Sequence, residues 1–190
     1  MTEKKTALIC DSENSALIVI DIQTHLTAVM PAKVLARLQR YTGLLINAAK
    51  TLDIPIFATE QYPRGLGNME EDLATLLPEN AKRYEKTCFS CINADNFLND
   101  LSQLGRKQIV LAGMEAHVCV LQTAIDLLNL DFQVVVVADA VCSRHRESYE
   151  TALQRLRQSG TIISNAESII FEWIRDARHE HFKTLQQLLR

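Results

Sequence analysis

The chain has 190 residues, of which 47% are hydrophobic and 23% charged. This length favours a single domain, which we expect to span residues 1–190 with a core at roughly 15–175. A formal charge of −3 argues against a polyanionic partner such as nucleic acid. The five cysteines are an odd number, so complete disulfide pairing is excluded and reduced thiols are expected.

Neither a secretory leader nor a membrane span is expected. Residues 1–5 are polar, and the strongest apolar runs, 16–20 and 134–138, have five residues each. A membrane-spanning helix needs about 20 apolar residues, and a secretory leader needs a longer apolar region behind its charged start. We therefore expect a cytoplasmic protein without a membrane partner.

Short β-branched runs alternate with helical patterns along the chain. Continuous apolar runs predict strands that are covered on both faces, and apolar residues at helical spacing predict helices between them. In chain order we expect a strand at 17–20, a helix at 34–52, strands at 54–58 and, more weakly, 83–85, a helix at 97–104, a strand at 109–112, a buried helix at 118–130, a strand at 134–138, a helix at 149–156, a strand at 161–163 and helices at 164–173 and 182–189.

This alternation through short links predicts a three-layer α/β/α domain with a parallel sheet and right-handed crossovers. The spacing Ser164-x-x-Glu167 is that of a capping box, which predicts a helix start. The irregular stretch 59–68 contains Pro63, Gly65 and Gly67 and predicts a surface loop.

Reactive side chains follow several of the predicted strands. Asp21 follows the first strand, Lys86 follows the weak one, and Cys119 lies six residues past Gly113, where the helix at 118–130 begins. Ligands of open parallel sheets bind beyond the carboxyl ends of the strands. A thiol in the first turn of a helix also faces free N–H groups and the positive end of the helix dipole, so we expect a lowered pKa for Cys119.

Each of these residues has an alternative role that the sequence leaves open. Cys119 is also consistent with a buried small hydrophobe, Asp21 with a turn or cap residue, and Lys86 with a solvated side chain. Cys88 and Cys91 have C-x-x-C spacing, but no second pair of zinc ligands follows them, so we interpret this stretch as the wall of a pocket.

The motifs around these residues resemble those of the isochorismatase-like cysteine hydrolases, and they extend in order over residues 15–173. They are Asp21-Ile22-Gln23, Lys86 with Thr87-Cys88-Phe89-Ser90, Gly113-Met114-Glu115-Ala116-His117-Val118-Cys119-Val120, Ala138-Asp139-Ala140 with Ser143-Arg144, and Ala166-Glu167-Ser168 with Phe171-Glu172-Trp173. The stretch Thr59-Glu60-Gln61-Tyr62-Pro63 is similar to that of family members of uncertain substrate.

The resemblance implies a Rossmann-like fold with six parallel strands, and a hydrolase that cleaves a small amide or related C–N bond through a thioester. It implies Cys119 as the nucleophile, Asp21 as the general base and acid, and Lys86 as their electrostatic partner. A non-proline cis peptide is expected at Met114–Glu115, with the N–H groups of Glu115 and Cys119 forming the oxyanion hole.

The resemblance further implies a homo-oligomer and a small-molecule substrate that contacts Gln23, Gln61, Phe89 and Cys91. The nicotinamidase branch has a metal-binding His after the second strand, and this chain has none there, so no metal and no cofactor are expected. Two alternatives remain, namely a binding or scaffold protein of the same fold without turnover, and a flavodoxin-like nucleotide- or flavin-binding domain. The latter is less favoured, because no glycine-rich phosphate loop follows the first strand.

Overall fold

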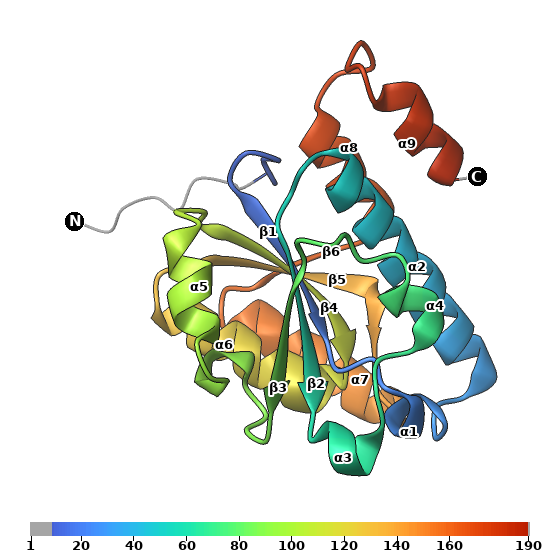
Figure 1. The fold of residues 1–190 in the computed structure, drawn as a ribbon, viewed down its shortest axis with the longest axis vertical. Helices are drawn as coiled ribbons and strands as arrows, with labels where there is room; N and C mark the ends of the chain where they lie inside the picture. Colours follow the sequence, from blue (N-terminus) through green and yellow to red (C-terminus); the bar gives the residue numbers. More distant parts are fainter. Residues whose placement is uncertain (1–8, 190) are drawn as a thin grey trace.

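The computed structural model describes residues 9–189 of the chain. It consists of strands and helices in alternation (Figure 1). The elements are β1 (Ser15–Ile20), α1 (Thr24–Thr27), α2 (Ala32–Thr51), β2 (Ile56–Gln61), α3 (Pro63–Leu66), α4 (Glu71–Ala74), β3 (Lys82–Lys86), the 3-10 turn η1 (Cys91–Asn93), α5 (Phe97–Gln103), β4 (Gln108–Met114), the π-helical turn η2 (Ala116–Val120), α6 (Leu121–Asn129), β5 (Gln133–Cys142), α7 (Arg146–Gln158), β6 (Ile162–Ser164), α8 (Ala166–Ile174) and α9 (Phe182–Leu188).

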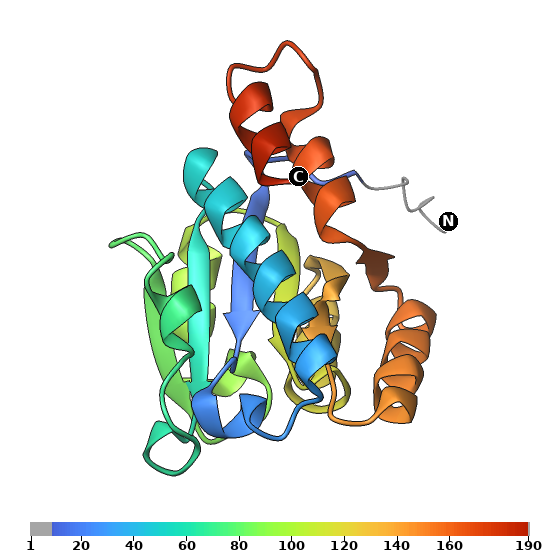
Figure 2. The ribbon, with the colours of Figure 1, turned by 90° about the vertical axis from the view of Figure 1, so that its right-hand side faces the viewer.

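The six strands form one parallel sheet in the order β3-β2-β1-β4-β5-β6. Helices α2 and α8 cover one face, and α5, α6 and α7 cover the other (Figures 1 and 2). The chain turns back at β1, in the middle of the sheet, and such a reversal of strand order creates a crevice at the carboxyl ends of the strands. The predicted three-layer α/β/α architecture is confirmed.

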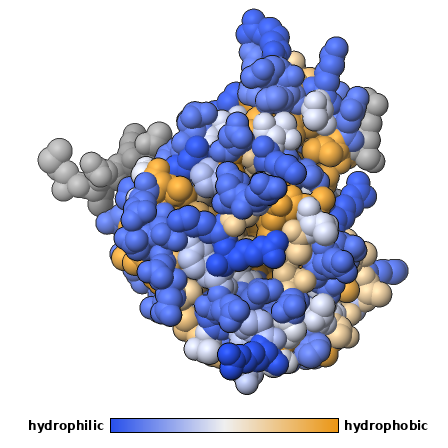
Figure 3. All heavy atoms as spheres, viewed as in Figure 1, coloured by the Kyte–Doolittle hydropathy of each residue, from blue (hydrophilic) through white to orange (hydrophobic). Residues whose placement is uncertain are grey.

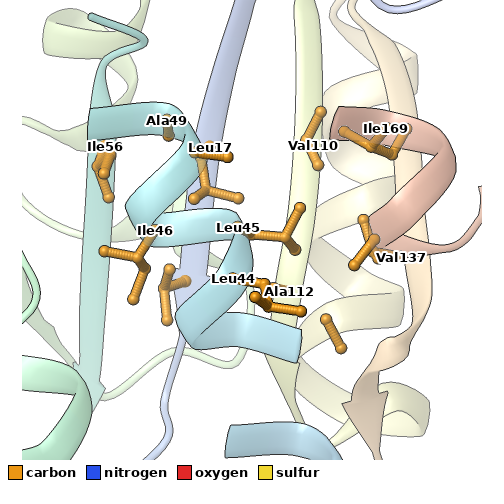
Figure 4. Packing of buried hydrophobic residues seen from close by; sticks show 14 of the residues in the cluster. Leu17, Leu44, Leu45, Ile46, Ala49, Ile56, Val110, Ala112, Val137 and Ile169 are labelled. Atoms are coloured by element: carbon orange, nitrogen blue, oxygen red, sulfur yellow. The ribbon is translucent and has the colours of Figure 1, made fainter. Parts of the chain in front are cut away.

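Strand β1 supplies side chains to a separate hydrophobic core on each face of the sheet. Leu17 and Val19 pack beneath α2, whereas Ile18 and Ile20 pack beneath α5 and α6. Figure 4 shows the first of these cores, in which α2 lies across β1 and β4. Because both faces are covered, the strand reads as a continuous apolar run instead of an alternating one.

Most of the predicted elements are found close to their expected positions. The weak strand at 83–85 is confirmed as β3, at the edge of the sheet. The helical stripe at 34–52 is α2, and the expected buried helix at 118–130 is the turn η2 followed by α6. Among residues 9–189, every helix is too short or too polar to cross a bilayer.

The expected loop at 59–68 and the expected helix cap at Ser164 are both wrong. The predicted loop at 59–68 begins with residues of β2, which extends to Gln61, and Thr59 is buried. The polar composition of these residues favours a loop, and hydrogen-bond partners from distant parts of the chain make the strand possible. The predicted cap Ser164 instead ends β6, and α8 is capped by Asn165, whose side chain accepts the N–H of Ser168 at 2.9 Å. The two residues are adjacent and both are common caps.

The face of the molecule seen in Figure 1 is mainly hydrophilic, and polar side chains separate its apolar areas (Figure 3). The carboxyl ends of β1, β2 and β3 meet at the lower end of the sheet in Figure 1, beside α1 and α3. Asp21, Gln61, Lys86 and Met114 all lie at this edge, because each ends or directly follows a strand.

Candidate active site

A buried ion pair lies at the carboxyl edge of the sheet. Asp21 directly follows β1, Lys86 ends β3, and β2 lies between the two strands. The Lys86 Nζ is 2.6 Å from Oδ2 of Asp21, and neither side chain has any exposed surface. Charges removed from water in this way must be paired, because each would otherwise carry an uncompensated desolvation cost.

The ammonium group of Lys86 is fully engaged within the protein. Besides Asp21, it donates to Oε1 of Gln61 at 2.7 Å and to the carbonyl oxygens of Phe89 at 3.1 Å and Cys88 at 3.3 Å. An ammonium has three N–H donors, so none is left for a further ligand. The positive charge of Lys86 is therefore satisfied entirely by partners within the protein.

Strand β2 contributes two side chains that hold the ion pair. Thr59 and Gln61 are two residues apart on the strand, so they point to the same face of the sheet. The Thr59 hydroxyl donates to Oδ1 of Asp21 at 2.7 Å, while Gln61 accepts from Lys86 and donates through Nε2 to the carbonyl of Thr87 at 2.7 Å. The middle strand thus contacts both members of the pair.

Cys119 lies in η2, the turn that connects β4 to α6, and its side chain is almost completely buried. Burial raises the pKa of its thiol, and the negative charge and hydrogen bond of Asp21 raise it further, whereas the positive charge of Lys86 lowers it. The expectation of a lowered pKa is therefore wrong. The helix-start effect that the sequence suggested is outweighed by burial next to a carboxylate.

The interaction with Asp21 gives the thiol its chemical partner. A thiol with a raised pKa is protonated at neutral pH, and it becomes a nucleophile only when a base accepts its proton. Asp21 is placed to do so. Burial also lowers the pKa of Lys86, but the charge and hydrogen bond of Asp21 outweigh this effect, so the net shift is upward and the ammonium stays charged.

The peptide bond between Met114 and Glu115 is cis, where the family resemblance placed it. The side chain of Glu115 turns towards Arg144, which donates to it through Nη2 at 2.8 Å and through its backbone N–H at 2.9 Å. Burial raises the pKa of Glu115, but the hydrogen bonds and charge of Arg144 outweigh burial and lower it overall. The Glu115–Arg144 pair thus anchors the start of the segment that carries Cys119.

Gly113 allows β4 to approach β1 closely at the site. Its φ of +121° is a conformation that L side chains rarely adopt, and a Cβ atom at this position would lie 2.1 Å from the carbonyl oxygen of Ile20. Ile20 directly precedes Asp21. The glycine therefore fixes the spacing between the strand that leads to Asp21 and the strand that leads to Cys119.

The four residues expected to contact substrate lie in different environments. Gln23 is fully buried, and its amide bonds the backbone of Gln61 and of Gly67. Gln61 is engaged with Lys86, and Cys91 is fully buried. Gln23, Gln61 and Cys91 are thus enclosed by protein, whereas Phe89 exposes about half of its surface, 52%, and substrate contact by these four residues stays a prediction.

A pocket of about 360 Å³ opens beside the carboxyl end of β3. Tyr62, Arg64, Lys86, Cys88 and Asn93 are among the residues that line it. Cys119 and Asp21 do not belong to this lining, and the side chain of Lys86 has no exposed surface, so the pocket borders the site without opening onto the thiol or the ion pair.

Thr59 and Thr123 are site residues that sequence reasoning missed. Thr123, one helical turn after Cys119, accepts the backbone N–H of Cys91 at 3.0 Å. The available signal for Thr59 was a polar residue two positions before Gln61, directly after an apolar run.

In the part of the chain that the structure describes, no group of three or more His, Cys, Asp or Glu side chains is arranged to hold a metal ion.

The fold and this site define a class of protein, a parallel α/β protein with a buried Asp–Lys pair beside a cysteine. Residues 15–168 match the model of the family described as "Isochorismatase domain". The chain belongs to this family of isochorismatase-like hydrolases.

Individual relatives support this assignment. The chain is 40% identical over 184 residues to isochorismatase family protein 1B of Dictyostelium discoideum, which covers 91% of this chain and 84% of that protein. A Caenorhabditis elegans structure described as MAR1 ribonuclease is 36% identical, with a TM-score of 0.89, covering 96% of this chain and 92% of that one. The Escherichia coli YcaC gene product, described as an octameric hydrolase of unknown specificity, shares the fold at 21% identity and a TM-score of 0.86, covering 98% and 97% of the two chains.

Proposed function

We propose that this protein is a metal-independent cysteine hydrolase that cleaves the C–N bond of a small amide or carbamoyl compound. The observation that carries the proposal is the contact of the Cys119 thiol with a carboxylate, Asp21, that a buried lysine holds in place. A nucleophile, its base and a group that fixes the base form the arrangement that covalent catalysis requires.

The reaction proceeds in two halves. Asp21 accepts the proton of the Cys119 thiol as Sγ attacks the carbonyl carbon, and the tetrahedral intermediate collapses when the C–N bond breaks. The leaving nitrogen departs with the proton that Asp21 held, which leaves a thioester on Cys119. Asp21 then takes a proton from water, whose oxygen attacks the thioester, and returns it to the sulfur, so that one amide and one water give one acid and one amine.

The proposed contacts favour a small, uncharged substrate. The N–H groups of Glu115 and Cys119 are proposed to hold the developing oxyanion, since Lys86 has no donor left for it. The carboxylate of Glu115 is already paired with Arg144, so it presents no free charge. The exposed ring of Phe89 is the proposed apolar contact at the rim of the site.

A screen of small amides and carbamoyl compounds for ammonia release tests the proposal. Cys119→Ala should lower the rate on an active compound by about 10⁴-fold or more, and prior treatment with a chelator should leave the wild-type rate unchanged. Hydrolysis by Cys119→Ala at a rate close to that of the wild type, or activity that chelation removes and zinc restores, would overturn the mechanism. A protein that hydrolyses nothing, although Cys119 and Asp21 are intact, would favour the scaffold alternative.

RNA cleavage is a second candidate function, because the Caenorhabditis elegans relative is described as a ribonuclease. The net charge of −3 does not favour RNA binding. Affinity for the phosphate backbone depends on Lys and Arg side chains that neutralise the phosphate charges. Wild-type protein and Cys119→Ala should be incubated with single-stranded RNA in parallel with the amide screen. RNA cleavage that Cys119→Ala lacks would replace the amide with a phosphodiester as the substrate.

Homo-oligomeric assembly and a cytoplasmic location complete the proposal. Val29, Tyr62 and Phe89 leave more than half of their surface exposed, at 61%, 52% and 52%, and large exposed apolar side chains are typical of subunit contacts. All five cysteines are free, which suits a reducing compartment. Light scattering of the purified protein would measure its mass, and a monomer would contradict the assembly.

A further inference from the structure

Thr59 holds Asp21 at two points, the backbone and the carboxylate, although no chemistry has been assigned to it. Its backbone carbonyl accepts the Asp21 N–H at 3.1 Å, and its hydroxyl donates to Oδ1 of Asp21 at 2.7 Å. The other carboxylate oxygen, Oδ2, is bonded to Lys86. Each carboxylate oxygen has two acceptor sites, so one remains open on each for the proton of Cys119.

The hydroxyl of Thr59 is itself fixed in direction. The side chain is β-branched and lies in a strand, where its χ1 angle is restricted. Its Oγ1 lies 3.7 Å from Sγ of Cys91, whose backbone N–H is bonded to Thr123 on the helix that follows Cys119. A chain of contacts therefore leads from the base through Thr59 and Cys91 to the helix that the nucleophile precedes.

We propose that Thr59 is a positioning residue of the active site, which orients Asp21 towards Cys119 and stabilises its ionised form. This inference rests on the proposed function, since it requires Asp21 to accept the thiol proton. A hydroxyl that donates to a carboxylate favours the charged form over the neutral acid, and the effect is large where both groups are buried. The other titratable groups facing Asp21 are Lys86 from β3, Cys91 from η1 and Cys119 from η2.

The pH dependence of Cys119 alkylation by iodoacetamide gives a test that needs no known substrate. When a thiol and a carboxylate share a proton, the reaction rate rises with pH in two coupled steps. The lower step is the loss of the first proton from the pair. Asp21→Asn should leave a single step. Peptide mass spectrometry separates the alkylation of Cys119 from that of the half-exposed Cys88 and of Cys91, which has no exposed surface.

Thr59→Val removes the hydroxyl at nearly constant volume and should move the lower step upward by about one pH unit. Thr59→Ser keeps the hydroxyl and should restore the wild-type position. Thr42→Val is the matched control, because the Thr42 hydroxyl is equally buried but has no hydrogen-bond partner among residues 9–189. Thermal unfolding identifies any variant that does not fold, and Thr59→Ala then replaces Thr59→Val.

The outcomes separate this inference from the proposed function. Suppose that Asp21→Asn reduces a two-step profile to one step but Thr59→Val does not shift it. This result would overturn the role of Thr59 and leave the proposed function intact. A wild-type profile with one step, or no alkylation of Cys119, overturns both, since Thr59 would then have no coupled base to orient. An equal shift in Thr42→Val would mean a general effect of buried Thr-to-Val changes and would also overturn the assignment.

Discussion

Two ion pairs of nearly equal length lie in contrasting regions of this molecule. The Lys86–Asp21 pair at the carboxyl edge of the sheet has an N–O distance of 2.6 Å and no exposed surface on either side chain. The Arg146–Glu150 pair on α7 has a distance of 2.7 Å, with 85% and 56% of the side chains exposed. Water stabilises each charge of the second pair by itself, whereas each charge of the first depends on its partner. Burial, and not distance, decides what a pair contributes.

The largest effect should follow from breaking the buried pair. Lys86→Met leaves the Asp21 carboxylate buried without its cation, so we expect the free energy of unfolding to fall by about 3–5 kcal/mol in a urea titration. The double variant Asp21→Asn with Lys86→Met removes both charges and should recover most of this loss. A Lys86→Met protein as stable as the wild type would mean that solvent reaches the pair.

The stability of the protein at alkaline pH should sharpen the comparison between the buried and the exposed ion pair. Burial opposes the charge of Lys86, but Asp21 outweighs it and raises the pKa overall. The resulting stabilisation is complete below the ordinary lysine value of about 10.4 and is lost as pH rises through the higher folded-state value. Urea titrations at increasing pH should therefore bring wild type and Lys86→Met closer together above this range. A constant difference between them would contradict the raised pKa.

Asp21→Asn tests how the buried ion pair affects the reactivity of Cys119. The charge and hydrogen bond of Asp21 raise the pKa of Cys119, while Lys86 lowers it, so the variant should have more thiolate at neutral pH. We expect faster alkylation of Cys119 at pH 7, together with loss of amide hydrolysis by about 10²–10⁴-fold, because the general acid and base is gone. Slower alkylation would show that Asp21 does not hold the thiol in its protonated form.

The half-buried pair of Glu115 and Arg144 should show an intermediate effect. Glu115→Gln keeps the shape but removes the charge, and we expect a loss of about 1 kcal/mol of stability near neutral pH. The pKa of Glu115 is lowered overall, so this contribution is present above the ordinary value of about 4.3 and disappears as pH falls through the lower folded-state value. Unfolding titrations from pH 7 to pH 3 measure the change, and a difference that grows with acid would contradict it.

The exposed pair provides the smallest effect and the matched reference. Arg146→Gln should leave the unfolding free energy unchanged within the error of the titration, because solvent replaces the lost interaction. Raising the salt concentration should change the wild type and this variant alike. A destabilisation comparable with that of Glu115→Gln would break the proposed ranking by burial.

The sequence was informative where neighbouring residues decide the outcome. Apolar runs located the strands, and the rule that ligands bind at the carboxyl ends of parallel strands pointed to Asp21, Lys86 and Cys119 before any distance was known. The structure places all three at one edge of the sheet. Even β3, whose residues are mainly charged, was detectable, because an edge strand needs less apolar surface.

The sequence was misleading where hydrogen-bond or charge partners far along the chain decide the local structure or the pKa. Thr59 and Gln61 have the composition of a loop, and partners at least 25 residues away, such as Asp21 and Lys86, make their burial favourable. The pKa of Cys119 was misjudged for the same reason, since a helix start is visible in the sequence but a buried carboxylate beside the thiol is not. The depth at which Gln23 and Cys91 lie is likewise set by distant parts of the chain and is not visible in the sequence.

Gly113 has a consequence for any attempt to redesign this protein. Because even a methyl group at position 113 would collide with the backbone at Ile20, the gap between the two central strands cannot be widened by substitution there without displacing Asp21. A new substrate must therefore be accommodated by changes at the rim, such as Tyr62 or Phe89, whose exposed side chains can vary in size. The centre of the sheet acts as a fixed template, and adaptability is confined to the loops around it.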